Sequence, residues 1–286
     1  MEIIKFLQSF SNPILDYFFL FITNLGGQTL GLIISLIFLW CIDKRYGYKL
    51  IFAIAFSLAV NNIIKILINS PRPIGVEGIK SLGKETATGS SFPSGHSQGT
   101  ASTFTSLIVE FKKTWIIILS ITMMILVPLS RLYLGVHWPK DVIFGTIFGI
   151  ICVFISNHLF EYCERNEIAY PMFFLSALFI ILGIFLKNSD YFKSIGAFTA
   201  ICIGYFLEDK YIGFNPQEAQ IQKIFRMIIG TIGFVVIYIS FKILMSTSYA
   251  RDFLCYFSLG LWATVLAPYI FVNVSFKEQT AKKELN

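Results

Sequence analysis

The sequence predicts an all-α protein whose helices cross a membrane several times. Hydrophobic residues make up 55% of the chain and charged residues only 14%, with a mean hydropathy of +0.69. Soluble domains average about 25% charged residues, so this composition favours a polytopic membrane protein. The apolar residues also recur in stretches of bilayer-spanning length, which is about 17–25 residues. Together these observations predict a transmembrane helical bundle.

The predicted spanning helices follow one another along the chain, and most of the connections between them are short and charged. They are residues 27–42, 48–68, 95–111, 114–131, 141–160, 170–186, 190–207, 224–245 and 252–274. The preceding stretch, 13–25, is apolar but contains Asp16 and Asn24, and a Gly26-Gly27 pair follows it. We expect it to form an interfacial or re-entrant helix, and an ordinary first span is the alternative.

Polar clusters divide the chain into two predicted parts. In residues 1–165 the apolar helices alternate with cations and histidines, whereas residues 166–286 hold about four more apolar stretches without such a cluster. The cysteines lie mostly in apolar stretches without a Cys-x-x-Cys pair, so they indicate neither a disulfide framework nor a metal site. Basic residues are scattered at helix ends, which argues against nucleic acid as a partner.

The long connection at 74–92 stands out because it contains four glycines among serine, threonine and lysine residues. Long loops of this kind are often functional or mobile. It joins two polar clusters, so a lid over a site is one interpretation, and a flexible connector is the other.

The first cluster is Lys-x6-Arg-Pro at 65–73. Lys65 lies near the end of an apolar helix that Pro71 and Pro73 must terminate, and Arg72 lies between the prolines. An ammonium group and a forked guanidinium group suit a phosphate with several anionic oxygens. Cations near a bilayer are costly, so the pair predicts a phosphate site; snorkelling to the interface is the ordinary alternative.

The second cluster is Pro-Ser-Gly-His at 93–96. Ser94 is a favourable N-cap for the helix predicted at 95–111. The free amides of that first turn, at the positive end of the helix dipole, form an anion cradle that Gly95 leaves open. His96 would then lie beside the bound anion.

The third cluster is Ser-Arg-x5-His-x3-Asp at 130–141. Pro139 is suited to the first position of a helix, which places Asp141 in the first turn. A carboxylate on one nitrogen of His137 would fix the tautomer and leave the other nitrogen free to attack. Arg131 can add a second guanidinium group to the phosphoryl oxygens.

The ordered triple of clusters resembles the signature of the type 2 phosphatidic acid phosphatase (PAP2) superfamily, and all three parts match. The resemblance covers about residues 13–160 and implies the six-helix core of that family, followed here by extra C-terminal spans. It implies a metal-independent phosphatase without a cofactor. It further implies a nucleophile that forms a phosphohistidine (His137), a residue that orients it (Asp141), an acid that protonates the leaving oxygen (His96) and residues that hold the phosphoryl group (Lys65, Arg72, Ser94, Gly95 and Arg131).

The expected substrate is a lipid phosphate or a polyprenyl diphosphate, because a lipid tail can stay in the bilayer while the headgroup reaches the cations. Two alternatives remain: a phosphotransferase that uses the same histidine, and a transporter that binds phosphate without hydrolysis. The oriented pair of His137 and Asp141 favours catalysis, because binding alone needs only cations.

The predicted location is a plasma (inner) membrane, with membrane lipids as partners. The loops that carry the clusters are separated by two spans and therefore share a face. The opposite face has more lysine and arginine residues, among them Lys44, Lys112 and Lys113. Because these residues are enriched on the cytoplasmic side, the site is expected on the extracytoplasmic face.

Overall fold

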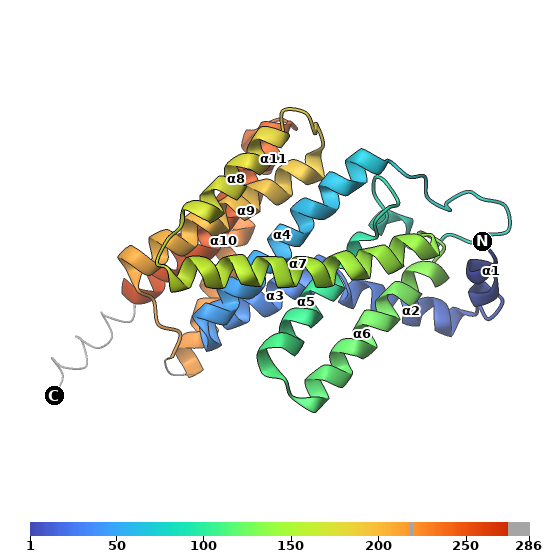
Figure 1. The fold of residues 1–286 in the computed structure, drawn as a ribbon, viewed down its shortest axis with the longest axis horizontal. Coiled ribbons are helices and arrows are strands. Elements are labelled where there is room, and N and C mark those ends of the chain that lie inside the picture. The colour runs from blue at the N-terminus through green and yellow to red at the C-terminus, as the bar shows by residue number, and fades with distance from the viewer. Residues whose placement is uncertain (218–219, 274–286) are drawn as a thin grey trace. The chain divides into compact units, whose positions relative to one another are not determined.

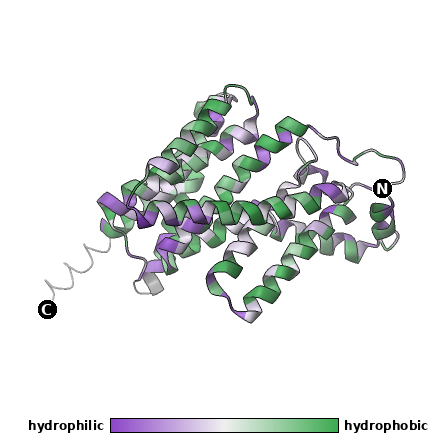
Figure 2. Ribbon diagram, in the orientation of Figure 1, coloured by the Kyte–Doolittle hydropathy of each residue, from purple (hydrophilic) through white to green (hydrophobic). Residues whose placement is uncertain are grey.

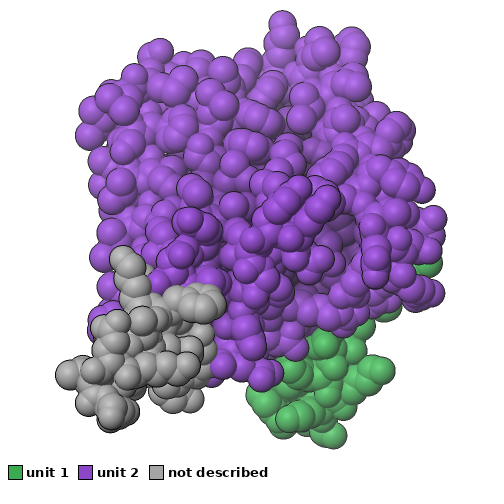
Figure 3. Space-filling model, turned by 90° about the vertical axis from the view of Figure 1, so that its left-hand side faces the viewer, with its two compact units in different colours: residues 1–33, 56–158 green, residues 34–55, 159–286 purple. Residues whose placement is uncertain are grey.

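All regular elements in the described part of the chain are helical, as predicted (Figure 1). The structure is a computed structural model that describes residues 1–217 and 220–273. It contains two compact units, which Figure 3 colours green and purple. Unit 1 comprises residues 1–33 and 56–158, and unit 2 comprises residues 34–55 and 159–286. The division into parts 1–165 and 166–286 stays a prediction.

Unit 1 contains the three polar clusters. Its elements are α1 (Glu2–Gln8), α2 (Pro13–Leu25), the start of α3 (Gln28–Ile37), the second half of α4 (Lys44–Ile68), the short η2 (Lys84–Thr86), α5 (Gly95–Phe111), α6 (Thr114–Tyr133) and most of α7 (Pro139–Arg165). Helices α5 and α7 begin where the sequence predicts, with Ser94 as the N-cap of α5 and Pro139 as the first residue of α7.

Unit 2 contains the remaining elements. They are the end of α3, η1 (Phe38–Ile42), the first half of α4, the end of α7, α8 (Tyr170–Leu182), α9 (Ser189–Leu207), η3 (Glu208–Ile212), α10 (Gln220–Leu244), α11 (Tyr249–Leu261) and η4 (Trp262–Leu266). Helix α9 packs so closely on α11 that a Cβ at Gly196 would lie 2.4 Å from the Phe253 carbonyl oxygen. Lys44 and the buried Glu208 form an ion pair at 3.0 Å. None of these residues belongs to the predicted site.

Five helical segments among the described residues are long and apolar enough to cross a membrane. They are Lys44–Ile68, Thr114–Tyr133, Pro139–Arg165, Gln222–Leu244 and Tyr249–Asn273, and they are predominantly hydrophobic in Figure 2. The pair Pro13–Leu25 and Gln28–Ile42 makes a sixth if the two helices, bent by 47°, form one broken span. This bend at the Gly26-Gly27 pair fits either a broken or a re-entrant first helix.

Three other predicted spans, at 95–111, 170–186 and 190–207, do form helices. Each of these helices is either too short or not apolar enough to count as a membrane span by itself. The predicted span at 252–274 extends one residue beyond the described part. Helix α5 shows one physical reason for the difference. All of its residues from 97 to 106 are buried, although most of them are polar. A helix that is surrounded by protein needs no apolar face toward lipid.

Hydrogen bonds tie α5 to its neighbours in unit 1. Gln98 donates to the Ser57 carbonyl oxygen of α4 at 2.8 Å and accepts from the Asn61 amide at 2.7 Å. The Thr100 hydroxyl donates to the Gly26 carbonyl oxygen at 2.7 Å, at the break between α2 and α3. Such interhelical hydrogen bonds stabilise helix packing inside a membrane. The second cluster therefore lies at the start of a buried helix that is hydrogen-bonded to its neighbours.

Two glycines set the separation of α5 and α7. A Cβ at Gly149 would lie 2.4 Å from the Gln98 carbonyl oxygen, and one at Gly145 would lie 2.7 Å from the Ser94 carbonyl oxygen. Small residues allow helix backbones to approach this closely. As a result, the starts of the two helices meet, and the Ser94 amide donates to the Asp141 carbonyl oxygen at 2.9 Å.

The substitution Gly149→Ala should force α7 away from α5 and destabilise the protein by about 1–3 kcal/mol, as overpacking does. The thermal midpoint in detergent measures this effect. Gly99→Ala on α5 is the matched control, because its new Cβ would meet only the flexible Gln28 side chain, at 3.5 Å. The close packing would be refuted if both variants melted at the wild-type temperature.

Candidate active site

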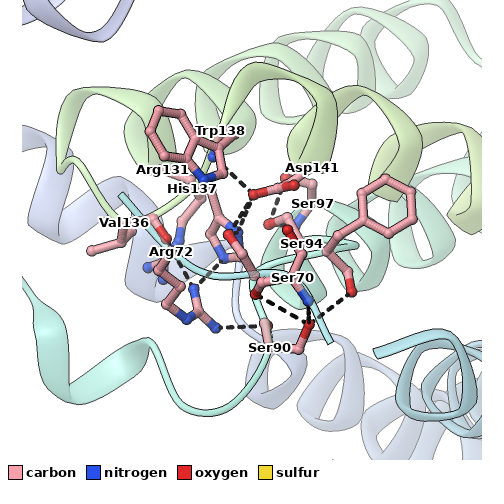
Figure 4. Close-up of polar contacts among 12 residues, drawn as sticks. Ser70, Arg72, Ser90, Ser94, Ser97, Arg131, Val136, His137, Trp138 and Asp141 are labelled. Carbon is pink, nitrogen blue, oxygen red and sulfur yellow. Dashed lines mark hydrogen bonds and ion pairs between the residues drawn. The ribbon is translucent and has the colours of Figure 1, made fainter. Parts of the chain in front are cut away.

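The first cluster is connected to the segment that precedes the second cluster. Helix α4 ends at Ile68, and beyond it the Ser91 amide donates to the Ser70 carbonyl oxygen at 2.8 Å. The Ser70 amide donates to the Ser90 hydroxyl oxygen at 2.9 Å. Segments that are about twenty residues apart in the chain thus lie side by side, as Figure 4 shows for Ser70 and Ser90.

Arg72 binds the segment before the second cluster and also contacts the third cluster. Its guanidinium group donates to the carbonyl oxygens of Gly89 at 3.0 Å, Thr88 at 2.7 Å and Val136 at 2.9 Å. Its Nη1 lies 2.9 Å from Nε2 of His137 (Figure 4). The Lys65 ammonium group donates to the Ser90 carbonyl oxygen. Arg72 of the first cluster therefore contacts the predicted nucleophile, and Lys65 contacts the loop segment that Arg72 also binds.

His137 and Asp141 are buried and lie at the start of α7. Nδ1 of His137 is 3.5 Å from Oδ2 of Asp141. The same Oδ2 accepts from the Trp138 amide at 2.8 Å, a capping contact at the helix start. Because a guanidinium group only donates, Nε2 of His137 must be the acceptor in its contact with Arg72, and the ring proton must be on Nδ1. In this tautomer Nε2 carries no proton, and its single electron pair faces the Arg72 guanidinium.

Electrostatics favour a neutral His137. Burial, reinforced by the charges of Arg131, Arg72 and Lys65, holds the pKa of His137 well below its ordinary value. Burial also lowers the pKa of Arg72, to about 10, which still leaves the guanidinium charged at neutral pH. The pair thus combines an unprotonated imidazole with a positive charge, which is the combination that attack on a phosphate requires.

The second cluster presents the start of α5. The Ser94 hydroxyl is buried and accepts from the Ser97 amide at 3.3 Å, as expected for an N-cap. Gly95 and the half-buried His96 follow in the first turn. The charges of Arg131, Arg72 and Lys65 all act on His96, so the histidine shares its surroundings with the cations of the other two clusters.

Arg131 has no exposed surface, and two threonines position it. Its Nη1 donates to the hydroxyl oxygens of Thr23 in α2 and Thr86 in η2, both at 2.9 Å. Its Nε is buried and has no hydrogen-bond partner within the described residues. A buried N–H of this kind fits an anionic oxygen, because an unsatisfied donor is costly.

The long loop is anchored at several points. Gln8 exchanges two hydrogen bonds with the Lys80 backbone, at 2.6 and 3.0 Å, and the Leu82 amide donates to the Leu134 carbonyl oxygen at 2.9 Å. The Lys80 ammonium group pairs with Asp16 at 2.8 Å. Such contacts are not those of an unattached connector, and the opening of the loop as a lid stays a prediction.

Sequence reasoning missed several residues that hold the predicted ones. They are Ser91, Trp138, Thr23 and Thr86. Ser91 lies in a stretch rich in serine, so its type and spacing carry no distinguishing signal. Thr23 lies in an apolar helix far from the clusters in sequence, and only the tertiary fold brings it to Arg131. No group of three or more His, Cys, Asp or Glu side chains suited to a metal occurs among the residues the structure describes.

This chain is similar to known proteins over most of its length. The model of the PAP2 superfamily matches residues 46–165, and the model of the PAP2 superfamily phosphatase transmembrane extension matches residues 192–279. The undecaprenyl-diphosphatase of Sulfolobus acidocaldarius is 26% identical over 54% of this chain and 76% of its own length. Sphingosine-1-phosphate phosphatase 1 of Rattus norvegicus is 28% identical over 69% of this chain, which spans about half of that protein (48%).

One solved structure, the crystal structure of Aquifex aeolicus LpxE, has 31% sequence identity and a TM-score of 0.49, and the match covers 54% of this chain and 92% of that one. The two family models lie on the predicted core and on the predicted C-terminal spans, and the matched relatives are named phosphatases. The three-part motif, the helical membrane fold and the two family models lead to one conclusion: the chain belongs to the PAP2 superfamily of membrane phosphatases.

Proposed function

We propose that the protein hydrolyses a lipid phosphate or polyprenyl diphosphate without a metal, through a phosphohistidine on His137. The observation that carries the proposal is the geometry around His137, whose Nδ1 lies 3.5 Å from Oδ2 of Asp141 and whose Nε2 lies 2.9 Å from Nη1 of Arg72. An imidazole oriented in this way is suited to attack phosphorus while a cation meets the developing charge.

The first step forms a bond between Nε2 of His137 and phosphorus and breaks the bond from phosphorus to the leaving oxygen. His96 donates the proton that this oxygen takes up. Lys65, Arg72, Arg131, the Ser94 hydroxyl and the Gly95 amide at the start of α5 hold the phosphoryl oxygens and neutralise their charge. In the second step a water molecule attacks phosphorus, His96 accepts its proton, and the bond to Nε2 breaks, which releases phosphate.

A lipid substrate is supported by an aromatic surface next to the site. Phe92, which follows Ser91, lies 5.6 Å from Phe144 and 6.3 Å from Phe148 of α7 between ring centroids. Phe144 is 44% exposed, and it follows Asp141 by three residues. A hydrocarbon chain leaving the phosphate at His137 could continue along these rings into the bilayer. Two of the matched relatives are named undecaprenyl-diphosphatase and sphingosine-1-phosphate phosphatase 1.

A phosphotransferase differs from this hydrolase only in the acceptor of the second step, an alcohol in place of water. A phosphate transporter would need the cations but not the oriented pair of His137 and Asp141. The plasma-membrane location and the extracytoplasmic site are part of the proposal, supported by the distribution of lysine and arginine.

Replacement of the nucleophile tests the mechanism. His137→Ala should lower phosphate release from lipid phosphates by at least about a thousandfold and abolish the covalent phosphoenzyme, as loss of a nucleophile does in other enzymes. His96→Ala should lose less activity on a substrate with a good leaving group, because protonation then matters less. The measurements are phosphate release in detergent with and without a chelator, and acid-labile labelling with a 32P substrate.

Wild-type activity in His137→Ala would eliminate the phosphohistidine. Activity that disappears with chelation and returns with Mg²⁺ would eliminate metal independence. Label transferred to an added alcohol faster than to water would identify a phosphotransferase, and phosphate uptake into vesicles without release from any lipid would identify a transporter.

Substitution of an aromatic residue tests the class of substrate. Phe144→Ala should raise KM for a long-chain lipid phosphate by roughly tenfold, because the chain loses apolar contact area. It should leave the kinetics of tailless p-nitrophenyl phosphate unchanged. Phe154→Ala is the matched control, since Phe154 is also exposed on α7, at 58%, but lies about 15 Å further along the helix. Equal effects of the two substitutions on the long-chain substrate would contradict a chain path along Phe144.

Cysteine labelling in intact cells tests the sidedness. All five native cysteines are buried and can be replaced first. A membrane-impermeant maleimide should then label Glu77→Cys in the long loop but not Lys113→Cys, between α5 and α6; both positions are exposed. Labelling of both variants in permeabilised cells is the control for accessibility. The reverse pattern in intact cells would place the site on the cytoplasmic face.

A further inference from the structure

The carboxylate that orients His137 is itself held through a single oxygen. Oδ2 of Asp141 accepts from the Trp138 amide and from the Ser91 hydroxyl, and it faces Nδ1 of His137 at 3.5 Å. The other oxygen, Oδ1, is buried and has no hydrogen-bond partner among the described residues. The direction of the carboxylate toward His137 therefore depends on two donors. One is the backbone amide of Trp138, and the other is the side-chain hydroxyl of Ser91.

The direction of the hydroxyl bond follows from the chemistry of the two groups. An ionised carboxylate only accepts, so the one hydroxyl proton of Ser91 must point to Oδ2. The lone pairs of the hydroxyl oxygen then remain for Nδ1 of His137, which lies 3.5 Å away. The proton on Nδ1 thus has two acceptors, Asp141 and Ser91. Both favour the tautomer in which Nε2 carries no proton.

Burial and a backbone hydrogen bond hold Ser91 in place. Its side chain has no exposed surface, and its amide donates to the Ser70 carbonyl oxygen at 2.8 Å. The hydroxyl is therefore placed by the same segment pairing that holds Arg72 beside the nucleophile. The contacts of this hydroxyl are with Asp141 and His137, so it acts on the reaction through these two side chains.

We infer that Ser91 is a positioning residue, which aims the Asp141 carboxylate at Nδ1 of His137 and so keeps Nε2 ready for attack. Ser91 lies outside the three clusters that define the family motif. The inference rests on the proposed function, since it concerns the rate at which His137 forms the phosphoenzyme.

A double-mutant cycle with Asp141 tests this role. Ser91→Ala should lower kcat and the single-turnover rate of phosphohistidine formation by roughly tenfold to a hundredfold, the effect of losing a hydrogen bond to a charged group. KM should change less than about twofold, because uniform binding of substrate is untouched. In an Asp141→Ala background the same substitution should cost less than about twofold, because the carboxylate that Ser91 directs is absent.

Ser106→Ala is the matched control. Ser106 is a buried serine in α5 whose hydroxyl donates to the Ser102 carbonyl oxygen of the same helix at 2.8 Å, so its loss should leave kcat at the wild-type value. Equal thermal midpoints of Ser91→Ala and Ser106→Ala would show that the rate effect is not one of folding.

Three results would overturn the inference: wild-type kcat in Ser91→Ala, a rise in KM alone, or the same fold-loss in both Asp141 backgrounds. The test separates this inference from the proposed function. If His137→Ala were as active as the wild type, the phosphohistidine mechanism itself would fail. If His137→Ala were inactive and Ser91→Ala fully active, only the role of Ser91 would be lost.

Discussion

The contact between the Arg72 guanidinium and Nε2 of His137 is the interaction on which the rest of the site depends. It joins the end of α4 to the start of α7 and defines the tautomer of the imidazole. The remaining donors of Arg72 are used by backbone carbonyl oxygens at 88–90 and 136. A half-buried charged group needs such partners, because an unpaired buried charge is very costly. The same bonds therefore stabilise the cation and arrange the loops around it.

This contact is possible because the helices of unit 1 approach one another closely. The glycines of α7 allow its backbone to lie against α5, and the two helix starts then share the hydrogen bond between Ser94 and Asp141. The site consequently lies where the first turns of two helices meet. The free amides of α5 begin at this junction, and the start of α7 holds the histidine and its carboxylate there.

The polar interior of unit 1 explains how an apolar protein maintains several buried charges. Arg131 is paired with threonine hydroxyls, and Asp141 is paired with a serine hydroxyl and an amide. Hydroxyl and amide partners satisfy donors and acceptors without adding opposite charge. The cations therefore keep a net positive field, which draws an anionic phosphate and favours a neutral imidazole.

The sequence by itself determined the fold class, the ends of the key helices and the three clusters. These features depend on local physics: apolar length predicts helices at 114–131 and 141–160, Ser94 caps a helix, and Pro139 begins one. The number of spans does not follow from apolar length alone, because the buried helix α5 is polar and its neighbours replace lipid. The contacts of Thr23 and Thr86 with Arg131, and the hydrogen bond from Ser91 to Asp141, emerge only from the folded arrangement. These partners come from distant segments, and a hydroxyl group has the same sequence signature wherever it lies, so only the packing of the helices selects which ones reach the site.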